Sequence, residues 1–259
     1  MEVILKLPNN QPFPIKCSQN KNSNASIINV LEKSNSNFML KTKRQLIIKT
    51  TFWNEVPNII RYRFQYKNNN FICLHESNNL SLTTFNCCDR SFEINKFRKI
   101  VIILESPHVD EYTFSMIPIA PAQGVTGRKI NSNIENLLKK IKNQLDFIDN
   151  EIIEVALVNP IPLQTSLGTI HKKSLKGKYC TLRNNVWKCI WKNTDYKEKF
   201  INLINTLHSR DIIINACTST LKNKVSTALL EAEDFKGTIF NTNHPSARRN
   251  WLKRFDHIR

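Results

Sequence analysis

The sequence lacks any apolar run of about 18 residues, the minimum that reads as a membrane-spanning helix. Its first residues, MEVILKLPNN, have no basic start followed by an apolar segment. We therefore expect neither a membrane span nor a secretion signal. No C-x-x-C pair occurs among the seven cysteines, whereas zinc sites usually show such close pairs. Free thiols in a reducing cytosol are expected, with no metal site.

Acidic residues are scarce. The chain has 21 Asp and Glu against 38 Lys and Arg, so its formal net charge is +17. An excess of this size makes a polyanion the first partner to consider, and we expect DNA. The alternative is that the charge serves solubility alone. Nothing in the sequence calls for a dimer, so a monomer is expected.

Residues 1–95 predict a small, mostly β lobe. Asparagine is abundant there, and RYRFQYK (61–67) and FICLH (71–75) alternate their side chains as strands do. The NNN between them predicts a hairpin with a three-residue turn. The lobe has no evident catalytic residues. Four of its side chains either extend a DNA-binding surface or are merely exposed: Trp53, Arg61, Tyr62 and Arg63.

From residue 96 onward, apolar runs alternate with helical periodicity. KIVIILES, IIEVALV, DIIINAC and GTIFNT are typical of strands buried on both faces. Between the first two runs, Ile130, Ile134, Leu137 and Ile141 recur at helical spacing. The alternation predicts an α/β domain over residues 96–259, with three α/β/α layers and a central four-stranded parallel sheet.

Polar residues follow each predicted strand, at 105–108, 159–162, 217–219 and 244–249. In such sheets the ligand site lies outside the carboxyl ends of the strands. A carboxylate there can activate water or stabilise a cation, an amide can read a base edge, and an imidazole can donate to an oxygen that gains charge. This set suits hydrolysis of an N-glycosidic bond.

Each of these residues also has a purely structural interpretation. Glu105 is equally suited to a helix cap or an ion pair, and Asn159, which precedes a proline, to a turn. His108 is equally suited to the start of a helix. A lone histidine such as His244 is usually a satisfied surface residue.

Five segments resemble motifs of the uracil-DNA glycosylase superfamily, and they occur in the family's order. The segments are LESPH (104–108), AQGVTGRKINSNIENLL (122–138), VALVNPIP (155–162), IINACTSTLKNKVSTAL (213–229) and TNHPSARR (242–249). The likeness covers about residues 97–255 and implies that family's fold. It also implies a DNA glycosylase that flips out a damaged or modified base and leaves an abasic site.

The resemblance implies a role for each matching residue. His244 would stabilise the oxygen of the departing base, Asn159 would bind the edge of the flipped base, and Glu105 takes the acidic position of the first motif. The base pocket would be lined by residues of the first two motifs: Ser106, Pro107, His108, Gln123, Gly124 and Val125.

The chain departs from the family pattern at the position where one form of the first motif has Asp. Ser106 stands there, and a serine is a poor base. Glu105 must therefore activate the water, with Asp110 or Glu111 as alternatives.

Two further departures bear on cofactor and substrate. The iron–sulfur class of the family has a cysteine shortly after Asn159, where this chain has PIPLQTS, so we expect no cofactor. Val125 and Thr126 replace an aromatic residue that stacks on a small pyrimidine in many relatives. This predicts a roomier pocket for a bulkier base, such as glucosylated hydroxymethylcytosine in phage DNA, and a role in antiviral defence.

Base flipping requires a wedge and a grip on the backbone. Arg249 or Trp251 is the expected wedge, Arg248 a phosphate ligand, and Ser166 and Ser246 further phosphate contacts. The alternative for Trp251 is packing into the core. Three alternatives to the proposed enzyme stay open: a non-catalytic basic DNA-binding module, a uracil-specific repair glycosylase, and a nuclease. A nuclease would need a cluster of carboxylates to hold metal ions, and the sequence shows no such cluster.

Overall fold

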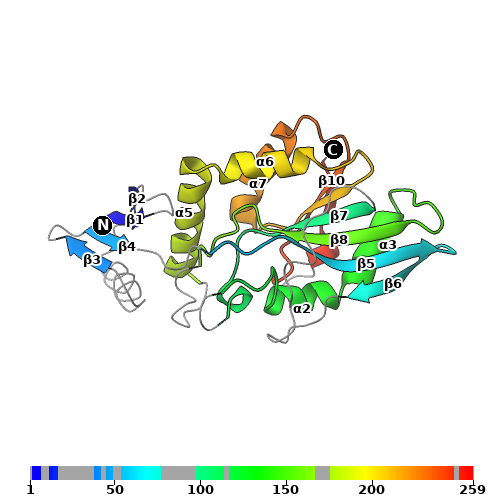
Figure 1. Cartoon of the computed structure of the whole chain (residues 1–259), viewed down its shortest axis with the longest axis horizontal. Helices are drawn as coiled ribbons and strands as arrows, with labels where there is room; N and C mark the ends of the chain where they lie inside the picture. The colour runs from blue at the N-terminus through cyan, green and yellow to red at the C-terminus, as the bar shows by residue number, and fades with distance from the viewer. Residues whose placement is uncertain are drawn as a thin grey trace.

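The computed structural model describes four short strands between residues 2 and 48, together with residues 54–76, 97–113, 117–166, 176–247 and 251–258. The described residues form five α-helices and eleven strands in two sheets (Figure 1). The mixed α/β class expected from the sequence is confirmed. No helix in these ranges is long and apolar enough to cross a bilayer.

The smaller sheet has four strands, and every described element before residue 50 belongs to it. Its strands are β1 (Glu2–Lys6), β2 (Pro12–Lys16), β3 (Phe38–Lys41) and β4 (Gln45–Ile48), in the order β2-β1-β4-β3. β1 pairs antiparallel with β2 and parallel with β4.

The larger sheet has seven strands in the order β11-β10-β9-β7-β8-β5-β6. Their bounds are β5 (Ile59–Lys67), β6 (Asn70–Glu76), β7 (Arg98–Ile103), β8 (Ile152–Val158), β9 (Ile212–Asn215), β10 (Thr238–Thr242) and β11 (Phe255–His257). The four predicted strands are β7 to β10, and neighbouring pairs among them are parallel. The sheet is wider than predicted because β11 adds antiparallel to β10 at one edge and β5 adds antiparallel to β8 at the other.

The predicted hairpin is present, but its turn has two residues rather than three. Asn70 already pairs with Lys67, so only Asn68 and Asn69 lie in the turn. Their φ angles of 48° and 65° are left-handed, which asparagine tolerates and which matches the twist of a tight hairpin. Because β5 pairs with β8, the boundary expected at residue 95 does not separate this hairpin from the main sheet.

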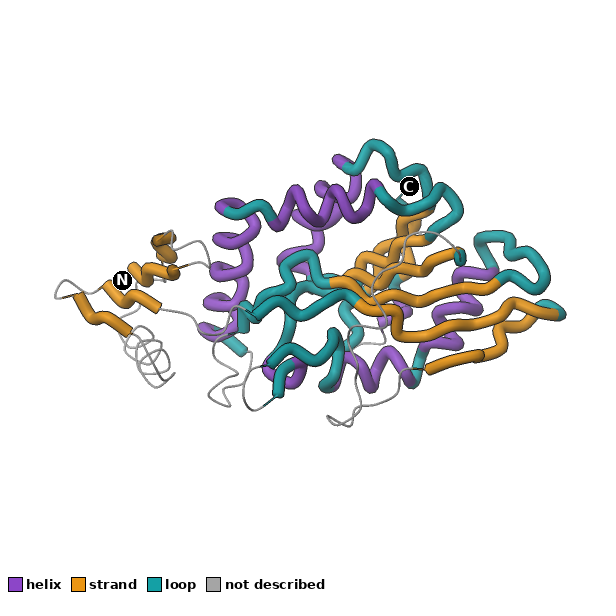
Figure 2. Tube along the Cα trace, in the orientation of Figure 1, coloured by secondary structure: helices purple, strands orange, loops and turns teal. Residues whose placement is uncertain are grey.

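Helices cover both faces of the large sheet (Figure 2). They are α2 (Val125–Asn131), α3 (Ile134–Lys142), α5 (Lys178–Asn193), α6 (Tyr196–Asn205) and α7 (Ser219–Glu231). Alternate residues of β7 face opposite layers, as strand geometry requires. Val101 and Ile103 pack in one core with α5, α6 and α7, whereas Ile100 and Ile102 pack in the other with α2 and α3.

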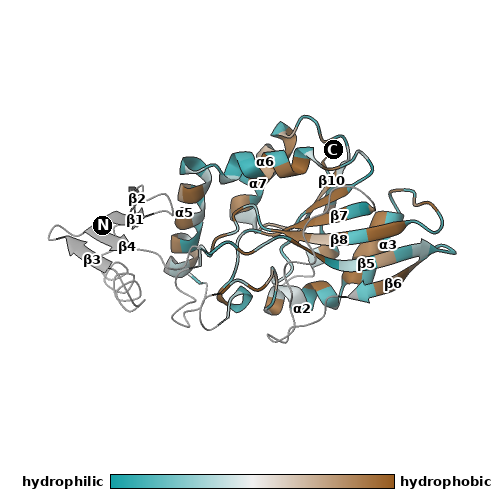
Figure 3. Cartoon of the chain, in the orientation of Figure 1, coloured by the Kyte–Doolittle hydropathy of each residue, from teal (hydrophilic) through white to brown (hydrophobic). Residues whose placement is uncertain are grey.

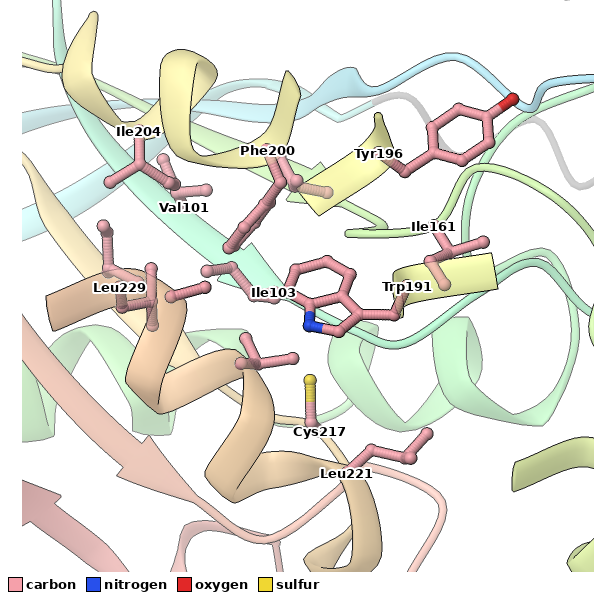
Figure 4. Packing of buried hydrophobic residues seen from close by; sticks show 14 of the residues in the cluster. Val101, Ile103, Ile161, Trp191, Tyr196, Phe200, Ile204, Cys217, Leu221 and Leu229 are labelled. Atoms are coloured by element: carbon pink, nitrogen blue, oxygen red, sulfur yellow. The ribbon is translucent and has the colours of Figure 1, made fainter. Parts of the chain in front are cut away.

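The core beside α5 is built around aromatic rings. Trp187 and Trp191 are one helical turn apart and stack with their centroids 4.9 Å apart, and Phe200 of α6 lies 5.9 Å from Trp191. Figure 4 shows Trp191 among Ile103, Phe200 and Cys217. The middle strands are mostly apolar and the helices are two-sided (Figure 3). Each large apolar side chain buried here contributes about 1.5–3 kcal/mol, and this packing fixes α5 against the carboxyl end of β7.

Candidate active site

A cavity of about 460 Å³ lies at the carboxyl ends of the parallel strands, at the edge predicted from the sequence. Glu105 reaches it from the end of β7, Thr218 from the end of β9 and His244 from the end of β10. Arg183 of α5 and parts of segment 105–126 complete its wall. A volume of this size is in the range of small-ligand pockets.

Glu105 and Arg183 form a buried ion pair in the cavity wall. Arg183 donates from Nη1 to Oε2 of Glu105, and the backbone N–H of Thr218 donates to Oε1. The side chains of Glu105 and Arg183 are 5% and 9% exposed. A guanidinium and an amide N–H both favour the ionised carboxylate, so Glu105 presents a negative charge to the cavity. Each of its oxygens keeps a second lone pair for another donor.

His244 stands in the cavity as a neutral imidazole. The backbone N–H of Ser246 lies 3.2 Å from Nδ1 of His244, and the hydroxyl of Ser246 lies 2.8 Å from the same atom. An amide N–H can only donate, so Nδ1 is the acceptor and Nε2 carries the ring proton. Burial, with smaller contributions from the charges of Arg183 and Lys222, lowers the pKa of His244 to about 3. The residue is therefore an uncharged hydrogen-bond donor at neutral pH.

Glu111 is a second buried carboxyl group in the same cavity, and its protonation state is the opposite of that of Glu105. It ends the 3-10 helix η2 (Val109–Glu111) and is 5% exposed. Burial raises its pKa to about 8, although hydrogen bonds from the backbone of Ala122 and His108 and from Asn159 partly oppose this. Glu111 is thus mostly protonated at neutral pH, which makes it unsuitable as the alternative base that activates water.

Asn159 does not line this cavity, although it lies close to it. Its Nδ2 is 3.5 Å from Oε2 of Glu111, and the residue lines a separate cavity of about 320 Å³ beside α6. The strand pleat explains this placement. Val158 faces the α5 side of the sheet, as Ile103 does, so Asn159 turns to the other side while Glu105 turns toward α5.

The predicted base-pocket residues divide into two groups. Four of them line the cavity: Ser106, His108, Gly124 and Val125. Pro107 and Gln123 do not line it, and Nε2 of Gln123 instead lies 3.4 Å from the carbonyl oxygen of Pro121. Ser106 pairs its hydroxyl with that of Thr165 at 2.6 Å. His108 also caps η2 by accepting from the backbone N–H of Asp110, as its structural interpretation predicted.

The wall made by Gly124 and Val125 is held by a tight backbone contact. Ala122 has a left-handed φ of 58°, unusual for a residue with a side chain. A Cβ on Gly127 would lie 1.7 Å from the carbonyl oxygen of Ala122. Only glycine fits at position 127, so this residue allows α2 to begin at the edge of the cavity.

The residues expected to grip DNA are only partly placed. Trp251, in the 3-10 helix η3 (Trp251–Lys253), is 2% exposed and packs in the core beside α3. The prediction of Trp251 as a wedge is therefore wrong, because a wedge must be exposed, and the packing alternative holds. Ser246 is exposed but bonds His244, and Ser166 lines the cavity. Arg248 and Arg249 lie outside the described residues.

The side chains expected to extend the DNA surface from the N-terminal lobe do not form one surface. Arg61 is 1% exposed, and its guanidinium has no hydrogen-bond partner among the described residues. Tyr62 is buried as well. Arg63 is half exposed and pairs with Glu154 at 2.5 Å. Trp53 lies outside the described ranges.

A second large cavity, of about 570 Å³, lies at the opposite edge of the sheet. Two of its cations share one acid, since Arg98 and Arg210 both pair with Glu151. Asp211 accepts the backbone N–H groups of Lys99 and His208. These contacts therefore hold the N-terminal ends of β7, β8 and β9 together. Nowhere in the described ranges do three His, Cys, Asp or Glu side chains gather closely enough to hold a metal ion.

Arg183 is the site residue that the sequence analysis missed. A helix over its segment is indicated by Val186, Trp187, Ile190 and Trp191, an apolar pattern of helical spacing. Arg183 precedes Trp187 by four residues and so shares its face. A lone arginine on an apolar helical face is a signal that could have been used.

Comparison with known proteins finds no counterpart for this chain. No family model matches it, and neither a curated protein nor a solved structure does. Any role for the chain is thus argued from the cavity and its residues.

Proposed function

We propose that this protein is a DNA glycosylase that hydrolyses the N-glycosidic bond of a flipped-out, modified base. One observation carries the proposal: Glu105 and His244 follow two different parallel strands and open onto one cavity. The first is an ion-paired carboxylate and the second a neutral imidazole donor. Glycoside hydrolysis needs this pairing, because the sugar becomes cationic while the base becomes anionic.

The reaction divides between these two groups. The C1′–N bond breaks and its electron pair leaves with the base, while Nε2–H of His244 donates to the base oxygen that gains charge. The negative charge of Glu105 stabilises the cationic sugar. A water oxygen then bonds to C1′, one of its protons passes to Glu105, and the departing base takes up that proton. Arg183 and the N–H of Thr218 hold the carboxylate in place.

The finer proposal concerns the family and the base. Strands β7 to β10 correspond to the central parallel sheet of the uracil-DNA glycosylase superfamily, on the motif resemblance already described. Val125, which is 51% exposed, and Thr126 form an open side of the cavity, and no aromatic ring of Phe, Tyr or Trp lines the cavity within the described ranges. This supports a base larger than uracil, such as a modified cytosine in phage DNA.

DNA is the partner that the charge supports. The formal net charge of +17 favours a polyanion, and neutralised phosphates make such binding strongly dependent on salt. The buried pair of Glu105 and Arg183 lines the cavity, together with two uncharged groups, Glu111 and His244. A half-exposed carboxyl group, Asp110, also lines it and lies 3.3 Å from His108. The cavity therefore suits a neutral base rather than a phosphate.

The proposal is tested by incubating the protein with duplex and single-stranded DNAs that carry one modified base each. The bases are uracil, hydroxymethylcytosine, glucosylated hydroxymethylcytosine and an alkylated purine. Free base is measured by mass spectrometry and abasic sites by alkaline cleavage. Release of a modified cytosine supports the proposal, and release of uracil alone supports the repair enzyme. Binding without release indicates the non-catalytic module, and cleavage without alkali or released base indicates the nuclease.

A further inference from the structure

Three carboxyl groups line the cavity, and the two buried ones, Glu105 and Glu111, have opposite surroundings. The third, Asp110, is half exposed and lies 3.3 Å from Nδ1 of His108. Glu105 is bonded by a guanidinium and a backbone N–H. Glu111 has no ion pair among the described residues, and its carboxyl group is hydrogen-bonded by the amide of Asn159 and by backbone N–H groups of Ala122 and His108. When two acids share a cavity and only one has a cation, they divide into a charged group and an uncharged donor.

Glu111 is held firmly in position. Its backbone N–H donates to the carbonyl oxygen of His108 at 2.9 Å, and its carbonyl oxygen accepts from the N–H of Ile119 at 2.8 Å. The amide of Asn159 meets Oε2 at 3.5 Å. Backbone N–H groups of Ala122 and His108 also hydrogen-bond this carboxyl group. These contacts hold the carboxyl group in one orientation, and its protonated form offers one O–H donor beside an acceptor oxygen.

The surroundings of Glu111 keep this proton in place. Burial is the main cause of the raised pKa of about 8, and the charge of Asp110 adds to it. The titratable groups on the surrounding elements are His108, Asp110 and Tyr112 of its own segment, Glu105 after β7, Cys180 and Arg183 of α5, and His244 after β10. Arg183 is committed to Glu105 and His244 is neutral, so neither supplies Glu111 with a counter-ion.

We propose that Glu111, oriented by Asn159, is the group that recognises the base, and that it selects bases whose edge carries a ring-nitrogen acceptor beside an exocyclic amine. Cytosine and its derivatives have this edge. The inference rests on the proposed function, since it names the substrate class of the same cavity. Asn159 is then a positioning residue that acts through Glu111 rather than the group that touches the base.

The protonated state is the reason for choosing cytosine over uracil. The ring nitrogen of cytosine has no proton and must receive one hydrogen bond, which only a protonated carboxyl can donate. The ring nitrogen of uracil carries a proton, and a charged carboxylate would accept it well. Surroundings that keep a buried carboxyl uncharged are useful where the carboxyl has to donate. Ionised Glu111 would instead place two acceptors face to face.

The test measures binding to DNA whose target nucleotide has a 2′-fluoroarabino sugar, which resists hydrolysis. The target base is hydroxymethylcytosine or uracil, and the proteins are wild type, Glu111→Gln and Glu111→Ala. Gln offers a donor and an acceptor at every pH and so mimics the protonated acid. Kd is measured from pH 7 to pH 9, and base release from matched cleavable DNAs is followed in parallel. Thermal unfolding checks that each variant is folded.

We expect the wild type to prefer hydroxymethylcytosine and to lose about tenfold of that affinity from pH 7 to pH 9, because the protonated fraction falls about tenfold around a pKa near 8. Glu111→Gln keeps the preference without the pH dependence, and Glu111→Ala loses about 10- to 100-fold in affinity. Equal binding of both bases, or the same pH dependence in Glu111→Gln, overturns the assignment of Glu111. Absence of base release from every cleavable DNA overturns the glycosylase proposal instead, and the binding data then decide the role of Glu111 independently.

Discussion

The guanidinium of Arg183 is hydrogen-bonded to the carboxylate of Glu105, and both side chains are buried at the carboxyl end of β7. The contact joins α5 to the end of β7, one of the strand ends at which the sequence predicts the site. It also decides the chemistry of the cavity, because it holds one acid in its charged form while Glu111 keeps its proton. Burial lowers the pKa of Arg183, but a guanidinium stays charged at any physiological pH.

Replacing Arg183 by Gln leaves the carboxylate of Glu105 buried without its cation. We expect a loss of about 3–5 kcal/mol in the free energy of unfolding, since one partner of a buried pair is removed. The double variant Glu105→Gln, Arg183→Gln should recover much of this loss. Urea unfolding of the wild type, the two single variants and the double variant gives the coupling energy between the two side chains. Additive single losses would show that the two side chains do not interact.

Replacing His244 by Ala should slow base release by about 10²- to 10³-fold, as the loss of a hydrogen-bond donor to a developing oxyanion does. DNA affinity should hardly change. The pKa near 3 means that His244 is neutral throughout pH 5.5–7.5. Wild type and His244→Gln should therefore show the same shape of rate profile over that range. A titration near pH 6.5 that vanishes in His244→Gln would contradict the neutral imidazole, and equal losses of affinity and rate in His244→Ala would make the residue structural.

Gly127→Ala should destabilise the wall of the cavity. The new Cβ would lie 1.7 Å from the carbonyl oxygen of Ala122, so the backbone of this segment must move. We expect about 3 kcal/mol of destabilisation, at the upper end for overpacking. Gly177→Ala is the control, because Gly177 has a φ of 51° but open space around it, and should cost about 1 kcal/mol from backbone strain alone. Thermal unfolding compares them, and equal costs would mean that the contact with Ala122 is relieved without strain.

Trp251→Ala should act on stability rather than on DNA binding. Trp251 is 2% exposed in the core beneath the sheet, and truncating a buried tryptophan costs about 3–5 kcal/mol. Trp251→Phe keeps most of the apolar volume and serves as the matched control with a smaller cost. Denaturant unfolding and DNA affinity are measured together. A stable Trp251→Ala protein with weakened DNA binding would restore the wedge.

The central part of the fold was predictable because its signals are local. The runs that became β7 to β10 are mostly apolar, as is typical of strands buried on both faces. The two edges of the sheet were not predictable in this way. β5 joins β8 across about 90 residues of sequence, and nothing in the residues of the hairpin identifies that partner.

The candidate site was predictable in position but not in detail. Residues after parallel strands meet at one edge, so Glu105 and His244 were correctly expected to share a cavity. The direction of Asn159 depends on the strand pleat, which a one-residue shift reverses. The placement of Glu111 depends on irregular backbone between η2 and α2, including the left-handed Ala122, and no periodic pattern encodes such a path.

The proposed reaction is tested most directly by the rate of base release, measured with protein in excess over DNA. The DNA carries hydroxymethylcytosine either with or without its glucose. Free base is quantified by mass spectrometry for wild type and Glu105→Gln, a variant that keeps a hydrogen-bond acceptor for Arg183. We expect the wild type to release one base for each abasic site formed. Glu105→Gln should bind DNA equally well but release base at least about 10²-fold more slowly. Tight binding by the wild type with no released base, or an unchanged rate in Glu105→Gln, would contradict hydrolysis at this cavity.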